Sequence, residues 1–297
     1  MKKHLLLLCI LCLGVLSLFR TDVSAEEGTA QEAGKRMVKT VDGIEYAFRW
    51  CPPGTFIMGS QQVEDDYIEY DGELEDTGYY TPHQVTLTRG FWILETEVTQ
   101  EMWESIMGTN VEEQWAKSFY GRFPKEKDRW LPAIEPRFPM YYVNHEECRN
   151  FCWKLSWRLE MEVKLPTEAQ WEYACRAGTT EEFAGILDSM GWYALNSKEM
   201  LHHVGQKKPN AWGLCDMYGN VWEWCSDKYR KYPDEHVTDP EDLSSAAGAW
   251  FDGFRVTRGG GWKTDAEYCR SAIRGEMKQE LRNCFTGFRV VLPAPVQ

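Results

Sequence analysis

Cysteines are the reactive side chains that stand out in this sequence. The chain contains 10, of which Cys9 and Cys12 fall in the first 25 residues, which leaves Cys51, Cys148, Cys152, Cys175, Cys215, Cys225, Cys269 and Cys284. None of these eight forms a C-x-x-C pair and no histidine pair has ligand spacing, so a zinc site is not expected. In an exported chain, an even number of cysteines indicates disulfides, although spacing leaves their connectivity open.

Carboxylates are concentrated in one segment. Residues 61–76 contain eight of them, which predicts a solvated acidic loop, and their spacing matches no EF-hand pattern. The whole chain has a formal net charge of −13. This excess disfavours nucleic acid and anionic membranes as partners, because both are bound through Lys and Arg. The sequence motifs of serine hydrolases, P-loop nucleotide-binding proteins and H-E-x-x-H metalloproteases are absent.

The N-terminus has the pattern of an export signal. Lys2 and Lys3 precede an apolar run over residues 5–19, and residues 23–25 are small enough for a cleavage site. The apolar run is shorter than a bilayer span, so we expect a cleaved signal peptide over residues 1–25 rather than an uncleaved anchor. The mature protein is then exported, to the periplasm or out of the cell, and keeps no membrane span.

The remainder of the chain is expected to form one folded domain. Residues 26–39 are polar and without periodicity, so we interpret them as a linker. No internal repeat or second linker follows, which assigns residues 40–297 to a single domain. Aromatic residues make up 14% of the chain, which favours irregular loops held by large side chains over a regular helical bundle.

Local patterns predict short helices and antiparallel strands. Residues 38–56 are expected to form a hairpin around the turn-forming Asp42-Gly43, and residues 83–88 alternate as a strand does. Helices are expected over residues 99–108, 144–159 and 167–178, with Thr99, Asn144 and Thr167 as N-caps. Together these elements indicate an α+β fold, in which a few short helices lie beside loop-rich antiparallel strands.

A series of short motifs crosses this domain. In chain order they include Phe56-Ile57-Met58-Gly59-Ser60, Glu97-Val98-Thr99, Leu165-Pro166-Thr167-Glu168-Ala169-Gln170-Trp171-Glu172, Asp216-Met217-Tyr218-Gly219-Asn220-Val221-Trp222-Glu223-Trp224, Arg258-Gly259-Gly260 and Gly287-Phe288-Arg289-Val290. Their order and number, over roughly residues 45–293, resemble the formylglycine-generating enzyme family, also called the sulfatase-modifying factor domain. The resemblance implies a C-type-lectin-like variant fold. Members include oxidases, iron-dependent sulfoxide synthases and ligand-binding proteins, so the chemistry must be argued from the site.

The resemblance also implies where copper would bind. The family's oxidases convert a cysteine of a sulfatase to formylglycine with O₂ and copper, using two cysteines five residues apart just after the Gly-Gly pair. Counted from Gly260, these positions are Thr264 and Cys269. Two soft thiolates suit Cu(I), and threonine supplies none. Copper is therefore not expected and no catalytic residue is assigned, with Cys269 retained only as a candidate lone catalytic thiol.

A structural role for Cys269 is the other interpretation. Counted backward from Ala272-Ile273-Arg274, Cys269 lies near, though not on, the family's structural cysteine. The disulfide partner of that cysteine matches Cys175. The resemblance thus favours a Cys175–Cys269 disulfide over the lone thiol.

The resemblance also implies a calcium site in residues 216–223, within the motif that runs from Asp216 to Trp224. The resemblance assigns its ligands to Asp216, Gly219, Val221 and Glu223, two side chains and two backbone carbonyls. Hard oxygen ligands in a tight loop suit Ca²⁺. The alternative is a plain turn, in which Asp216 caps backbone N–H groups and Glu223 pairs with an arginine. We expect the motif arginines, Arg258, Arg274 and Arg289, to anchor loops through carboxylates.

Two functions from different classes follow. The first is an exported, non-oxidase protein that binds a ligand or acts as a scaffold, with an unknown protein or small molecule as partner and calcium as cofactor. The second is a formylglycine-generating oxidase, or a related protein-maturation enzyme, whose substrate is a sulfatase. The missing thiolate at Thr264 favours the first.

Overall fold

The computed structural model describes residues 31–61, 67–70, 73–76, 79–123, 131, 133–241 and 253–294. From Gln31 onward the chain forms one compact unit. The expected signal peptide, residues 1–25, lies outside the described residues. The range expected to be a linker, 26–39, lies partly outside the described residues, and the first strand begins within it, at Arg36.

The N-terminal hairpin confirms the predicted turn. Strands β1, Arg36–Val41, and β2, Ile44–Cys51, pair antiparallel around Asp42 and Gly43. Both turn residues have positive φ, 52° and 83°, as a two-residue hairpin turn requires. The sheet continues through β7, Phe91–Leu94, to β13, Val291–Pro293, in the order β1-β2-β7-β13. The two ends of the domain therefore share one sheet.

Two further sheets complete the framework around the motifs. One has the order β11-β10-β8-β12 and is formed by Arg274–Lys278, Phe254–Arg258, Trp222–Lys228 and Thr286–Gly287. The other has the order β3-β6-β9 and is formed by Gly54–Met58, His83–Leu87 and Val237–Thr238. The predicted strand over 83–88 is thus confirmed as β6. Most pairings are antiparallel, whereas β8–β12 and β6–β9 are parallel.

The acidic segment differs from the prediction. Within it the structure has a two-stranded hairpin, β4, Tyr67–Tyr70, and β5, Glu73–Asp76, rather than a loop throughout. Antiparallel pairing of Tyr70 with Glu73 satisfies backbone groups locally, which the carboxylate count alone does not reveal.

The three predicted helices are present with their predicted N-caps. They are α1, Gln100–Met107, α4, His145–Leu159, and α5, Glu168–Arg176. Asn144 and Thr167 form complete capping boxes with Glu147 and Gln170. The α5 helix ends at Ala177 in the left-handed region, one residue before the predicted Gly178. The sequence analysis missed α2, Val111–Lys117, and the short elements η2, Tyr120–Arg122, α6, Leu187–Met190, and η4, Ala266–Cys269.

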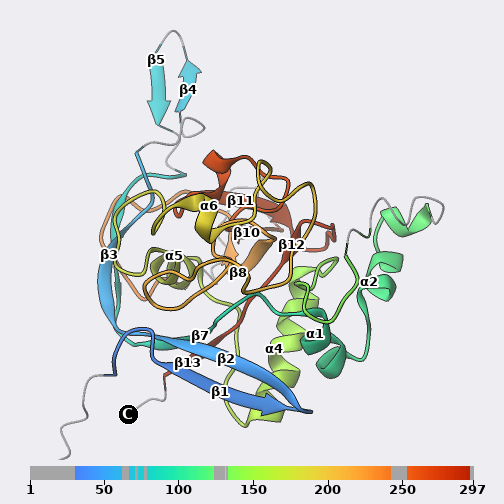
Figure 1. Ribbon diagram of the computed structural model, residues 1–297. Coiled ribbons are helices and arrows are strands. Elements are labelled where there is room, and N and C mark those ends of the chain that lie inside the picture. The colour runs from blue at the N-terminus through green and yellow to red at the C-terminus, as the bar shows by residue number, and fades with distance from the viewer. Residues whose placement is uncertain are drawn as a thin grey trace, which may run out of the picture. The chain divides into compact units, whose positions relative to one another are not determined.

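Aromatic side chains hold these elements together. Helices α1 and α4 lie side by side (Figure 1), and Trp103 stacks on Phe151 with ring centroids 5.8 Å apart. Trp171 of α5 and Trp224 of β8 are completely buried. The architecture is the loop-rich α+β fold that the patterns predict. None of the helices in the described residues is long and apolar enough to cross a bilayer.

Candidate functional site

The segment implied to bind calcium is a tight, left-handed loop that leads into β8. Asp216, Gly219 and Asn220 all have positive φ, 56°, 87° and 58°. At Gly219 a Cβ atom would lie 1.9 Å from the carbonyl oxygen of Trp192, so only glycine fits there. A positive φ is unfavourable for Asp216 and Asn220, so the surrounding structure must hold them in this conformation. Such strained residues are common in loops that form functional sites.

Glu223 pairs with an arginine, as the plain-turn alternative to a calcium site predicts. Its two carboxylate oxygens accept hydrogen bonds from Nε and Nη2 of Arg289, both at 2.7 Å, and Trp171 Nε1 donates to Oε2 at 2.8 Å. All three side chains are buried. Arg289 also donates to the carbonyl oxygens of Leu94 and Cys215, both at 3.1 Å. The bidentate pair therefore ties β8, β7 and the loop before Asp216 to one guanidinium group.

Asp216 is only half satisfied. Its Oδ2 accepts a hydrogen bond from the backbone N–H of Gly205 at 2.6 Å. Its Oδ1 is buried and, in the described part of the chain, has no hydrogen-bond partner. The same holds for both carboxylate oxygens of Glu97, a residue with no exposed surface. Three buried acceptor oxygens thus lack a donor, which is costly unless a proton or a cation is shared between them.

The carboxyl groups of Glu97 and Asp216 influence each other's pKa. Burial, opposed by the Gly205 hydrogen bond and Arg289, raises the pKa of Asp216 to about 6, and Glu223 adds to the rise. Burial, followed by repulsion from Asp216 and Glu223, raises the pKa of Glu97 well above its usual value. One arginine faces three carboxyl groups here, so the cluster disfavours full ionisation.

This donor set fits a hard cation. Among the described residues, no group of three or more His, Cys, Asp or Glu side chains is arranged to hold a metal ion. A calcium ion, however, also accepts backbone carbonyls, and the unsatisfied oxygens of Glu97 and Asp216 are of the type it prefers. Sequence reasoning missed Glu97 as a site residue, although it stands in the Glu97-Val98-Thr99 motif.

Cys269, the cysteine at the candidate copper position, is covered by the backbone at Gly260. Cys269, at the end of η4, has no exposed surface, and a Cβ atom on Gly260 would lie 2.4 Å from its Sγ. Burial raises the pKa of the Cys269 thiol to about 12. Thr264 is half-buried, and its backbone N–H donates to the carbonyl of Gly261. A protonated, covered thiol is a poor nucleophile and a poor copper ligand.

The structure gives no support for the expected disulfide. Cys175 and Cys269 are both free, buried thiols. The side chain that faces Cys175 is Ser271, whose Oγ lies 3.7 Å from its Sγ. Ser271 follows Cys269 by two residues, which agrees with the position of Cys269 near, but not on, the family's structural cysteine.

We therefore expect Cys175 and Cys269 to be unlinked in the purified protein. Unfolding in iodoacetamide without reductant should leave both peptides carbamidomethylated, with labelling as complete as in a sample reduced beforehand. Peptide mapping by mass spectrometry measures this. A Cys175–Cys269 linked peptide in the non-reduced digest would show that the expectation is wrong.

The remaining motif arginines anchor loops, as expected. Arg258 is buried and pairs with Glu172 of α5. Arg274 donates from Nε and Nη2 to Glu168 at 2.6 and 2.8 Å. Both carboxylates lie on one buried face of α5, so the helix joins β10 and β11 through charge-assisted hydrogen bonds.

Comparison with known proteins identifies the family. A model of the sulfatase-modifying factor enzyme 1-like domain matches residues 39–294, nearly the whole described chain. The chain belongs to this family. Within the sulfatase-modifying factor family it is 28% identical over 276 residues to the chaperone protein LppX of Paenibacillus barcinonensis, a match that covers 78% of this chain and 91% of LppX. It is 31% identical over 160 residues to the formylglycine-generating enzyme of Mycobacterium tuberculosis, covering 43% of this chain and half of the enzyme.

Solved structures share the fold of this sulfatase-modifying factor domain. Treponema denticola variable protein 1 superimposes with a TM-score of 0.70 at 26% identity, covering 87% of this chain and 99% of that protein. PvdO from Pseudomonas aeruginosa has a TM-score of 0.68 at 20% identity, with coverages of 89% and 100%. The predicted formylglycine-generating-enzyme-type fold is thereby confirmed.

Proposed function

We propose that this protein is an exported, non-oxidase member of the sulfatase-modifying factor family that binds a protein or small-molecule ligand. The observation that carries the proposal is the state of Cys269. Its thiol has no exposed surface, its pKa is raised to about 12, and Thr264 stands five residues before it. A Cu(I) site of the oxidase type needs two thiolates that a substrate cysteine can approach, and the buried Cys269 with threonine at position 264 supports the proposal that such a site is missing.

Binding as the main activity has a precedent among the relatives. The relative with 91% of its length matched is named a chaperone protein, LppX. By analogy, the partner of this protein would be another exported polypeptide that it holds without altering covalently. The predicted signal peptide is the basis for the export part of the proposal.

The oxidase is the second candidate, favoured by the relative named formylglycine-generating enzyme at 31% identity. Under that candidate the substrate would be a sulfatase cysteine, and Cys269 would have to become exposed and deprotonated. Its burial under Gly260 argues against this.

We expect no formylglycine when the purified protein is incubated with a cysteine-containing sulfatase peptide, Cu(I) and O₂. Mass spectrometry of the peptide measures the conversion, with an established formylglycine-generating enzyme as positive control. Conversion above the copper-only blank would support the oxidase, provided that Cys269→Ser abolishes it. Conversion that survives Cys269→Ser would point to a catalytic group other than Cys269 and would equally overturn the non-oxidase proposal.

We also propose that calcium binds at the carboxyl cluster. Glu97 and Asp216 would supply side-chain oxygens, and the resemblance adds the carbonyls of Gly219 and Val221. Glu223, although implied as a ligand, would instead keep its pair with Arg289 and hold the loop. When bound, calcium supplies positive charge that offsets the repulsion among the three carboxylates. It would stabilise the fold rather than take part in a reaction.

A further inference from the structure

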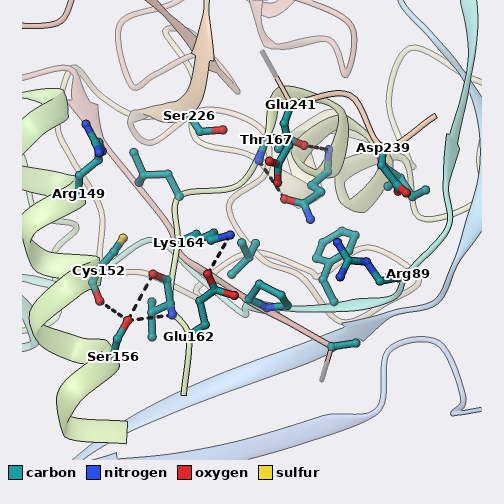
Figure 2. Close-up of a pocket in the computed structure, with 18 of the residues that line it drawn as sticks. Arg89, Arg149, Cys152, Ser156, Glu162, Lys164, Thr167, Ser226, Asp239 and Glu241 are labelled. Atoms are coloured by element: carbon teal, nitrogen blue, oxygen red, sulfur yellow. Dashed lines mark hydrogen bonds and ion pairs between the residues drawn. The ribbon is translucent and has the colours of Figure 1, made fainter. Parts of the chain in front are cut away.

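A pocket of about 610 Å³ opens on another part of the domain. It is bordered by α4, by the edge strand β13, by the turn between β6 and β7, and by residues 239–241 (Figure 2). Neither Cys269 nor the cluster of Glu97 and Asp216 is among the residues that line it. Its volume lies in the range of small-molecule sites.

One end of the pocket is cationic. Arg149 of α4 lines it there, together with Arg255 and His145. Arg149 is exposed and, in the described parts of the chain, forms no ion pair. Burial lowers the pKa of His145 to about 3, and the charges of Arg255 and Arg149 lower it further. His145 is therefore neutral, and the positive field at this end comes from the two guanidinium groups.

Two of the three carboxylates in the lining have partners other than Arg149, and the third, Glu241, is exposed and lies on the Thr167 side of the pocket in Figure 2, away from Arg149. Glu162 pairs with Lys164, Nζ to Oε1 at 2.9 Å. Asp239 accepts hydrogen bonds from the backbone and the hydroxyl of Thr88. Figure 2 shows Asp239 beside Arg89, on the opposite side of the pocket from Arg149. No carboxylate of the described lining is thus bonded to Arg149, although the whole chain carries a net charge of −13.

Much of the rest of the wall is apolar. Its apolar members are Leu87, Phe91, Cys152, Val163, Leu165, Val291 and Pro293. Trp153, one of the lining residues, follows Arg149 by one helical turn and remains 60% exposed. Such a large exposed aromatic beside a cavity is typical of a surface that a ligand covers. Gln170, also in the lining, uses its Oε1 for the α5 capping box, which leaves its amide N–H groups available as donors.

We propose that this pocket binds an organic carboxylate, with its charged group on Arg149 and its apolar body along the wall under Trp153. A guanidinium group and a carboxylate form paired, charge-assisted hydrogen bonds, which a neutral amide cannot match. The apolar body gains affinity with each buried methylene. The proposal concerns a site separate from the calcium cluster and stands whether or not calcium binds.

The test uses octanoate, with octanamide as its neutral isostere, in isothermal titration calorimetry on the mature protein. We expect one octanoate site, at least tenfold weaker binding of octanamide, and about fourfold weaker binding for each methylene removed from the chain. Arg149→Gln should weaken octanoate about tenfold or more, and Trp153→Ala should also weaken it. Lys154→Gln, the same charge change on the same helix outside the lining, should leave binding unchanged.

Any one of the following outcomes would overturn the proposal. They are no octanoate binding at millimolar concentration, equal affinity for octanoate and octanamide, and equal behaviour of Arg149→Gln and Lys154→Gln. Because Arg149 and Trp153 are exposed, neither substitution is expected to unfold the protein, and circular dichroism verifies this. If acetate bound as tightly as octanoate, the apolar wall would contribute nothing to affinity, which would also contradict the proposal.

Discussion

Replacing Arg289 by methionine should lower the free energy of unfolding by about 3–5 kcal/mol. The guanidinium group is completely buried and forms a bidentate pair with Glu223. Its loss would leave the carboxylates of Glu223, Glu97 and Asp216 together without a compensating charge, and would remove donors from two backbone carbonyls. Urea denaturation followed by circular dichroism measures the change, with the m-value showing whether the transition stays two-state.

Arg158→Met is the matched control. Arg158 also pairs with a carboxylate, Asp42, but both side chains are nearly half exposed. Exposed pairs contribute little, so this variant should change stability by less than about 1 kcal/mol. If the two variants destabilised the protein equally, Arg289 would not have the central role that its contacts indicate.

Without calcium, the protein should lose stability as the pH rises from about 4 to 7. The folded-state pKa of Asp216 is raised from 3.8 to about 6, and the pKa of Glu97 is raised as well. The folded state therefore holds protons that the unfolded chain has released, and this contribution disappears as the pH passes the folded pKa. A rise of this size in one carboxyl corresponds to roughly 3 kcal/mol. Thermal unfolding in a chelator at a series of pH values measures the loss.

Calcium should reverse that loss. An ion that binds only the folded state adds about 2.7 kcal/mol at a concentration 100 times its Kd. The gain should be larger near pH 7, above the raised pKa of Asp216, than near pH 4, where protons compete with the cation. Asp216→Asn and Glu97→Gln should each remove the calcium response and flatten the pH dependence.

Asp234→Asn, at an exposed carboxylate, serves as the control and should leave both responses intact. An unchanged melting temperature of the wild type with calcium and with chelator would contradict the calcium proposal. The pH dependence in chelator would still test, independently of calcium, whether the buried carboxyl groups of Glu97 and Asp216 retain protons in the folded state.

Features that depend on neighbours in sequence could be predicted. The N-caps of α1, α4 and α5 each involve residues three positions apart, so the pattern itself contains both partners. The Asp42-Gly43 turn is local in the same way. The order of the motifs was enough to predict the family, which the match over residues 39–294 confirms. The sequence alone likewise indicates that Thr264 stands where the family's oxidases have their first active-site cysteine.

The arrangement of the site required the tertiary structure. Glu97 and Asp216 are far apart in the chain, and no spacing rule predicts that burial would leave their oxygens facing each other. Glu223 has the same motif position whether it binds calcium or an arginine, and only the tertiary structure shows that Arg289 and Trp171 both bond to it. Likewise, a shift of two residues puts Ser271 rather than Cys269 opposite Cys175. Short-range hydrogen bonding is encoded in adjacent residues, whereas the partner of a buried charge is decided by which distant segments pack around it.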